Sequence, residues 1–229
     1  MPRSATRLLP LLALLAATGA SALHAQVVPR LARADFPLEG AGPGAFVPGG
    51  WKVARTVEGH LNGDSIPDRV LHLVTEETPD DRTGTDAAPE SQALVILLAK
   101  RGGGFRRGGV AGTLLQSGVP QYSLDLRVQR GVLITEEDYG MSDVVQLRHR
   151  FRLDPASGRF VLIGRDTYSY QRPLSRDDTF RTSENYLTGV RITTTGHVEG
   201  GVVARESERR ETIPRSRVFF EDVDVVTDG

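Results

Sequence analysis

The stretch VQLRHRFRLDPASGRFVLI, residues 145–163, decides the fold class because its side chains alternate in character. Apolar or aromatic side chains, with His149 among them, occupy every second position as far as Leu153. Polar side chains occupy the positions between them: Gln146, Arg148, Arg150 and Arg152. This period of two is typical of a β-strand with one wet face. DPASGR at 154–159 has the residue types of a turn, and 160–163 is apolar again, so the stretch predicts a β-hairpin.

The same signals extend in both directions along the chain. Residues 124–129 alternate, Arg130-Gly131 can turn, and 132–134 begin another strand, which predicts a second hairpin directly upstream. Residues 69–74 and 93–99 are apolar at nearly every position and predict central strands. Late strands are expected at 191–195 and 217–226, and only 206–212 has much helical propensity. The expected class is all-β: an antiparallel sheet of consecutive hairpins, propeller-blade-like or curved, with little helix.

The first 25 residues have the pattern of a secretory signal peptide. Arg3 and Arg7 precede an apolar run at 8–17 that is too short to span a bilayer, and small residues follow it. We expect a chain that is periplasmic or secreted and soluble after cleavage. Residues 26–50, rich in Pro, Gly and Ala, predict an extended lead-in, and 51–229 a single β domain. Within that domain the polar segment 76–91 predicts a flexible loop.

The composition of the chain excludes several classes of function. The chain has 28 Lys and Arg against 29 Asp and Glu, and loss of the two arginines in 1–25 makes the balance about −3. Nucleic-acid binding is therefore not expected. There is no cysteine, which excludes disulfides and thiol nucleophiles, and no later apolar run is long enough for a membrane span. Motifs of acyl and phosphoryl transfer are also missing, so no catalytic residue is assigned.

The segment GHLNGDSIPD, residues 59–68, has the spacing of a degenerate calcium loop. Asn62, Asp64 and Asp68 stand at ligand positions, but the first ligand is replaced by His60, whose nitrogen suits calcium poorly. The same residues also predict a metal-free turn in which Asn62 and Asp64 bond their own backbone. Calcium is the only cofactor that the sequence suggests, and both alternatives stay open.

With Trp51 upstream, this loop resembles the opening of FG-GAP/VCBS-type, integrin-like repeats. The segments at 144–170 and TSENYLTGVRI at 182–192 resemble a group of exported bacterial proteins of unassigned function. The resemblance implies a blade-like β fold and no transferable catalytic residues. Only one loop motif is present, which disfavours a complete propeller.

Two clusters are candidates for a functional site. Glu136, Glu137, Asp138 and Asp143 form the densest acidic group, which could supply a carboxylate pair for glycoside hydrolysis. The arginines at 148, 150 and 152 share one strand face and could bind an anionic partner, unless Asp125, Glu136 and Asp138 pair with them. Tyr186 is expected either to plug a sheet edge or to recognise a ligand.

The sequence favours an exported, non-enzymatic binding module whose partner is an envelope protein or a glycan. A cell-wall or glycan hydrolase that uses residues 136–143 is the main alternative, and a calcium-dependent adhesin fragment is a third. The oligomeric state stays open.

Overall fold

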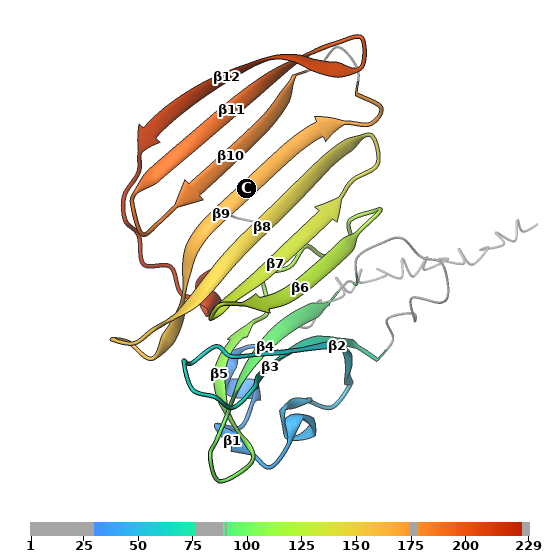
Figure 1. Ribbon diagram of the computed structural model, residues 1–229. Coiled ribbons are helices and arrows are strands. Elements are labelled where there is room, and N and C mark those ends of the chain that lie inside the picture. Colours follow the sequence, from blue (N-terminus) through green and yellow to red (C-terminus); the bar gives the residue numbers. More distant parts are fainter. Residues whose placement is uncertain (1–29, 77–88, 90, 175–177, 226–229) are drawn as a thin grey trace, which may run out of the picture.

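A computed structural model describes residues 30–76, 89, 91–174 and 178–225. The expected signal peptide at 1–25 and most of the expected loop at 76–91 lie outside the described residues. The strands form two antiparallel sheets built from consecutive hairpins, and no α-helix occurs in the described part (Figure 1). The prediction of an all-β, antiparallel fold is confirmed.

The five-stranded sheet has the order β1 (Glu39–Gly40), β5 (Phe105–Ala111), β4 (Gln92–Ala99), β3 (Asp68–Thr75), β2 (Trp51–Gly59). The seven-stranded sheet follows the chain, in the order β12 (Val202–Thr212), β11 (Val190–Glu199), β10 (Thr179–Asn185), β9 (Arg159–Gln171), β8 (Asp143–Asp154), β7 (Val132–Tyr139), β6 (Ser123–Gln129). Short 3-10 turns lie at η1 (Arg33–Asp35), η2 (Pro43–Phe46) and η4 (Phe220–Asp222).

Both predicted hairpins are present. In β8–β9, Asp154 pairs with Arg159, and the Asp154 carboxylate accepts a bond of 2.7 Å from the Ser157 hydroxyl inside the turn. In β6–β7, Arg130 and Gly131 have φ of 51° and 79°, the positive values that a tight two-residue hairpin turn requires. Local turn chemistry therefore sets the register of both hairpins.

The central strands of the five-stranded sheet, β3 and β4, are buried on both faces, as their apolar runs predict. One face, with Val70, Leu94 and Ile96, packs against the seven-stranded sheet through Leu133 and Phe151. The other face, with Leu71 and Leu97, belongs to a second apolar cluster. Because neither face of β3 or β4 meets water, their sequences lose the alternation seen in β8.

Residues 30–50, part of the segment expected to be an extended lead-in, cover this second face. Phe36 and Phe46 are buried there with Trp51. The Arg107 guanidinium donates to the carbonyls of Arg33 and Phe36 and ties the segment to β5. The segment is thus part of the packed fold.

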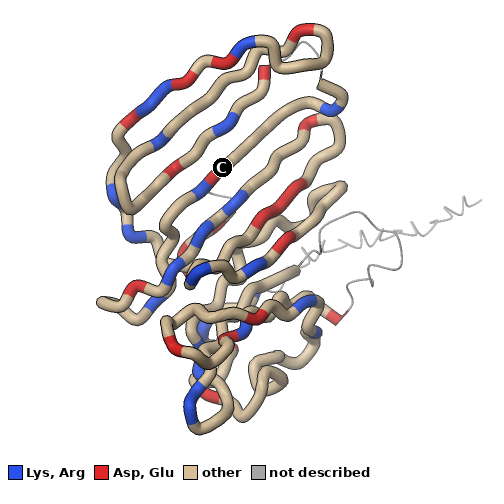
Figure 2. Tube along the Cα trace, viewed as in Figure 1, with Lys and Arg blue, Asp and Glu red and all other residues tan. Residues whose placement is uncertain are grey.

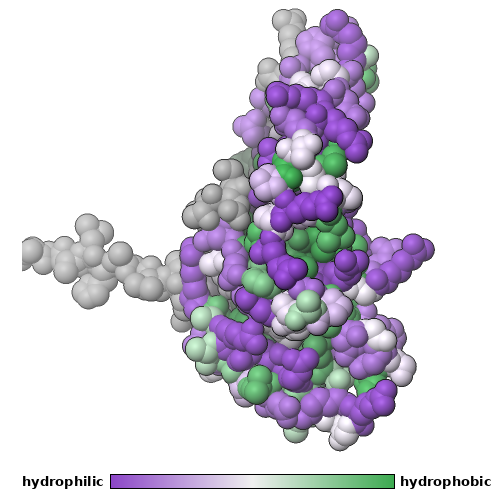
Figure 3. Space-filling model, turned by 90° about the vertical axis from the view of Figure 1, so that its left-hand side faces the viewer, coloured by the Kyte–Doolittle hydropathy of each residue, from purple (hydrophilic) through white to green (hydrophobic). Residues whose placement is uncertain are grey.

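The seven-stranded sheet is covered over only part of its area. We call the face that carries Leu133 and Phe151 its inner face, and the opposite face its outer face. Strands β6–β9 pack their inner face on the core, whereas every residue of β12 except Glu211 is exposed. The region where β10–β12 lie is narrow and mostly hydrophilic (Figure 3).

One local expectation is wrong, and one local propensity is overridden by strand pairing. Residues 206–212, with helical propensity, belong to β12, because pairing with β11 outweighs the intrinsic preference of the chain. Residues 217–225 form the 3-10 turn η4 and one isolated bridge instead of a late strand. This segment places Phe220 in the core between the sheets.

Candidate functional site

A cavity of about 510 Å³ lies on the inner face of the seven-stranded sheet, where the apolar core ends. Strands β7–β12 supply most of its wall. Gln116, Val223 and Val225 close it from the side of the five-stranded sheet. The bond from the Val225 amide to the Thr113 carbonyl, at 3.1 Å, holds this rim in place. The cavity volume is in the range of small-molecule sites.

A row of alternating charges crosses the floor of the cavity. Strand register places Arg165, Glu184, Arg191 and Glu211 side by side on β9, β10, β11 and β12. Glu184 Oε2 lies 2.9 Å from Arg165 Nε, and Glu184 Oε1 lies 2.8 Å from Arg191 Nε. The charges of the lining therefore balance within the site.

Glu184 is the centre of this row. Burial alone would raise the pKa of its carboxyl, but bonds from Tyr186 and both arginines outweigh burial and lower that pKa. The Tyr186 hydroxyl donates to Glu184 Oε2 at 2.7 Å. Tyr186, a candidate recognition residue, thus holds Glu184 in position and packs against the core.

The next row along the strands offers hydroxyl groups beside an apolar wall. Thr167, Thr182 and Thr193 pair in register across β9, β10 and β11. The apolar wall comes from the other side of the cavity: Tyr139, Val145, Leu147, Val223 and Val225. A ligand with both hydrogen-bonding and apolar surfaces fits this lining.

His149 is the most buried polar group in the lining. Its side chain is only 1% exposed, and Nδ1 has no hydrogen-bond partner. Burial, with the nearby Arg165, lowers the pKa of His149 to about 3, so the imidazole is neutral. An unpartnered buried nitrogen costs free energy unless water or a ligand satisfies it.

Glu137 lies at the junction of the two sheets. Its carboxylate accepts bonds from the Gln116 amide at 2.8 Å and the Tyr122 hydroxyl at 3.1 Å, and it is fully buried. Burial outweighs these bonds and raises the pKa of Glu137 to about 7. Gln92 of β4 donates to the same two residues, so the network bridges the sheets.

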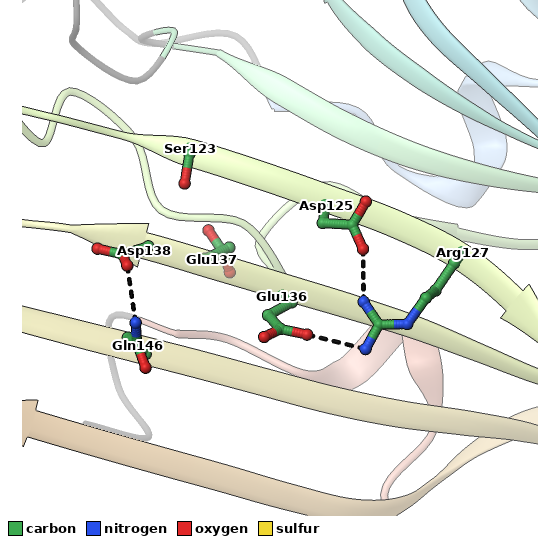
Figure 4. Close-up of a pocket in the computed structure, with 7 residues that line it drawn as sticks. All are labelled: Ser123, Asp125, Arg127, Glu136, Glu137, Asp138 and Gln146. Atoms are coloured by element: carbon green, nitrogen blue, oxygen red, sulfur yellow. Dashed lines mark hydrogen bonds and ion pairs between the residues drawn. The ribbon is translucent and has the colours of Figure 1, made fainter.

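The other acidic residues of 136–143 do not converge on Glu137. Glu136 and Asp138 lie on the outer face, in a depression of about 250 Å³, where Arg127 and Gln146 bond them (Figure 4). The bond from Arg148, with that from Arg127, lowers the pKa of Glu136 despite partial burial. Glu137, the carboxyl of this group whose pKa is raised, therefore points to the opposite face.

The predicted arginine ladder is paired within the sheet. Arg148 contacts Glu136 at 2.9 Å, and Arg150 contacts Asp166 at 2.9 Å. Arg152 is exposed at the far end of the row. The expected partner Glu136 is present, whereas Asp166 was not among the expected partners. Basic and acidic residues lie on neighbouring strands here (Figure 2).

The loop at 60–68 makes the backbone bonds expected of a structural turn. Asn62 Oδ1 accepts from the Asp64 amide at 3.0 Å, and Asp64 Oδ1 accepts from the Ile66 amide at 2.8 Å. Asp68 is buried and accepts from the amides of Leu61 and Ala99. With these oxygens engaged and His60 exposed, the geometry favours the turn. No group of three or more His, Asp or Glu among the described residues is placed to hold a metal.

Sequence reasoning missed the residues that define the cavity, above all His149, Arg165, Glu184 and Arg191. Four strands contribute the charged row, and only strand register brings it together. None of the described helices has the length and apolar character that crossing a bilayer requires. Comparisons of the chain with protein-family models, curated proteins and solved structures found no match.

Proposed function

We propose that this protein is an exported, non-enzymatic binding module whose ligand occupies the inner-face cavity. The observation that carries the proposal is the lining: an apolar wall faces a hydroxyl row and a charge row that are already ordered by strand register. Such a site is preorganised, so binding costs little side-chain ordering. The signal-like segment at 1–25 supports export.

The lining favours an uncharged glycan segment as the ligand. Because Arg165 and Arg191 are compensated by Glu184 and Glu211, a ligand with net charge gains little Coulomb energy. Carboxylates, guanidinium groups and threonine hydroxyls can pair with sugar hydroxyls. Tyr139 and Leu147 offer apolar surface to the C–H face of a sugar ring.

A glycan hydrolase is supported less well. The carboxyl with the raised pKa, Glu137, needs a second carboxylate on its own side within roughly 10 Å. Glu184, the next carboxylate along the inner face, lies three strands away, which corresponds to roughly 14 Å. The pairing that hydrolysis requires is therefore not assembled.

Adjacent threonines on β11 provide a test. Thr193 faces the cavity, and Thr194 faces outward between Arg181 and Glu208. Thr193→Val should weaken binding of neutral envelope glycans about tenfold in calorimetry, which is the loss of one or two hydrogen bonds. Thr194→Val, the matched control, should bind as the wild type does. Equal affinities of both variants would reject the cavity as the site.

A further inference from the structure

Strand β12 is an open edge of the seven-stranded sheet. It pairs with β11 on one side only, over residues 202–212 (Figure 1). Among the described strands, the opposite edge, β6, lies beside β2, and the edge strand β1 has two residues. β12 is therefore the longest edge strand in the described part of the chain, and no described strand lies beside its free side.

An exposed edge pairs with other strands unless something prevents it, and like-signed charge is a common means of prevention. A row of lysines repels a second copy in every register. β12 carries both signs instead: Arg205, Glu206, Glu208, Arg209, Arg210 and Glu211 (Figure 2). Mixed charge does not block self-pairing. It selects a register.

We propose that β12 pairs with β12 of a second copy, antiparallel, about a two-fold axis through Glu208. Glu206 then lies opposite Arg210 of the second copy, and Arg205 lies opposite Glu211 of the second copy. Symmetry repeats each pair. The two seven-stranded sheets join into one continuous sheet with their inner faces on the same side.

The neighbouring registers form fewer pairs of opposite charge between the two copies. A two-fold axis that keeps inner faces together must pass through one residue, because side chains alternate between faces. An axis through Ser207 sets Glu206 against Glu208 and Arg205 against Arg209. An axis through Arg209 sets that residue against itself and leaves only Glu208 with Arg210. The axis through Glu208 has one like-charged contact and the most opposite pairs.

The existing contacts of these side chains do not oppose the pairing. Arg205 bonds Glu199 at 2.9 Å and Arg209 bonds Glu211 at 2.8 Å, but the two arginine side chains are 72% and 78% exposed. Such pairs contribute little and exchange readily. A single strand edge is a small interface, so association should be weak and depend on concentration.

A charge swap tests the register. One variant carries Arg205→Glu with Arg210→Glu, and the other carries Glu206→Arg with Glu211→Arg. Each alone places like charges opposite each other at all of these contacts, whereas a mixture of the two restores every opposite pair. In sedimentation equilibrium from about 1 to 100 μM, a range that covers weak dimers, the wild type and the mixture should dimerise and each variant alone should be at least tenfold weaker.

The control is Arg101→Glu with Arg130→Glu, which makes the same change of net charge as the first variant, on two exposed turns. It should dimerise like the wild type. Recovery on mixing shows that the single variants are folded, because mixing does not repair a misfolded strand. The proposal is overturned if the wild type stays monomeric at 100 μM, if either variant alone dimerises like the wild type, or if the mixture stays monomeric.

Discussion

The two sheets share the same hairpin connectivity but differ in how much of their surface is buried. The central strands of the five-stranded sheet are buried on both faces, by residues 30–50 on one side and by the seven-stranded sheet on the other. The seven-stranded sheet packs its apolar core residues on the inner face of β6–β9, and beyond that boundary its strands carry mainly threonine and paired charges. The difference separates a stabilising region from one whose polar surface is free to bind.

The boundary between the regions explains where the cavity lies. The apolar row with Leu133 and Phe151 is followed along the strands by the row with His149 and Glu184. Groups at such a boundary are partly dehydrated yet reachable, and this combination favours specific binding.

The largest expected effect is the contrast between two leucines. Leu71 of β3 is fully buried, whereas Leu187 in the β10–β11 turn is 47% exposed. Leu71→Ala should lower the free energy of unfolding by about 3–4 kcal/mol through the cavity it leaves. Leu187→Ala should cost under about 0.5 kcal/mol. Urea denaturation measures both, and equal losses would contradict the contrast.

A second prediction concerns pH and the junction residue Glu137. Its pKa of about 7 in the folded protein exceeds the ordinary 4.5, so the folded state keeps a proton that the unfolded state releases. Its contribution to stability is complete below pH 4.5 and falls by about 3 kcal/mol by pH 7. His149 acts oppositely, because its pKa of about 3 makes stability rise from pH 3 to 6.5.

Single variants separate the opposite effects of Glu137 and His149 on how stability changes with pH. Glu137→Gln should leave a protein whose stability rises with pH between 4.5 and 6.5, since the falling contribution of Glu137 is removed and that of His149 remains. His149→Leu should give stability that falls with pH over the same range. Melting temperatures measured at several pH values give both slopes. Parallel pH profiles for the two variants would show that these groups do not have the assigned burial.

Tyr186 tests the cavity floor. Tyr186→Ala should destabilise by about 2 kcal/mol, because the ring packs on the core and the hydroxyl bonds Glu184. Tyr186→Phe keeps the packing and should lose only about 1 kcal/mol. A Phe variant as unstable as the Ala variant would place the main contribution in the hydroxyl.

Charge pairs on the outer face should contribute less to folding stability. Arg148→Ala removes contacts with Glu136, but the side chain is 42% exposed and screened by water. The expected loss is under about 1 kcal/mol, and added salt should reduce it further. A loss above 2 kcal/mol in denaturant titration would mean that this face is more buried than described.

Calcium should have the smallest effect on thermal stability. The oxygens of Asp64 and Asp68 already accept backbone amides. Millimolar calcium is therefore expected to leave the thermal transition unchanged, whereas a site occupied at 100 times Kd would add about 2.7 kcal/mol. A clear upward shift would restore the degenerate calcium loop.

Local sequence patterns predicted the strands and turns that depend only on side-chain alternation and turn residues. The alternation at 145–153 and the turn at 154–159 identified β8 and β9, and the doubly apolar runs identified β3 and β4. The division into two sheets depends on long-range packing, which no local period reveals. Residues 206–212 have helical propensity because Glu and Arg favour helices in isolation, whereas pairing with β11 decides their state.

The candidate site was harder to predict for the same reason. Arg165, Glu184 and Arg191 are spread over 27 positions and meet only through the register of three strands. A partial signal existed, since polar side chains occupy both faces of 165–169 and 191–195, which indicates that neither face is fully buried. The acidic run at 136–138 was more conspicuous, but strand alternation divides it between two faces.

Native-state hydrogen exchange tests the division between the two sheets most directly. Amides of β3 and β4 should exchange only through global unfolding, whereas amides of β12 should exchange many times faster through local opening. In dilute samples, protection of β12 equal to that of β3 and β4 would contradict this division.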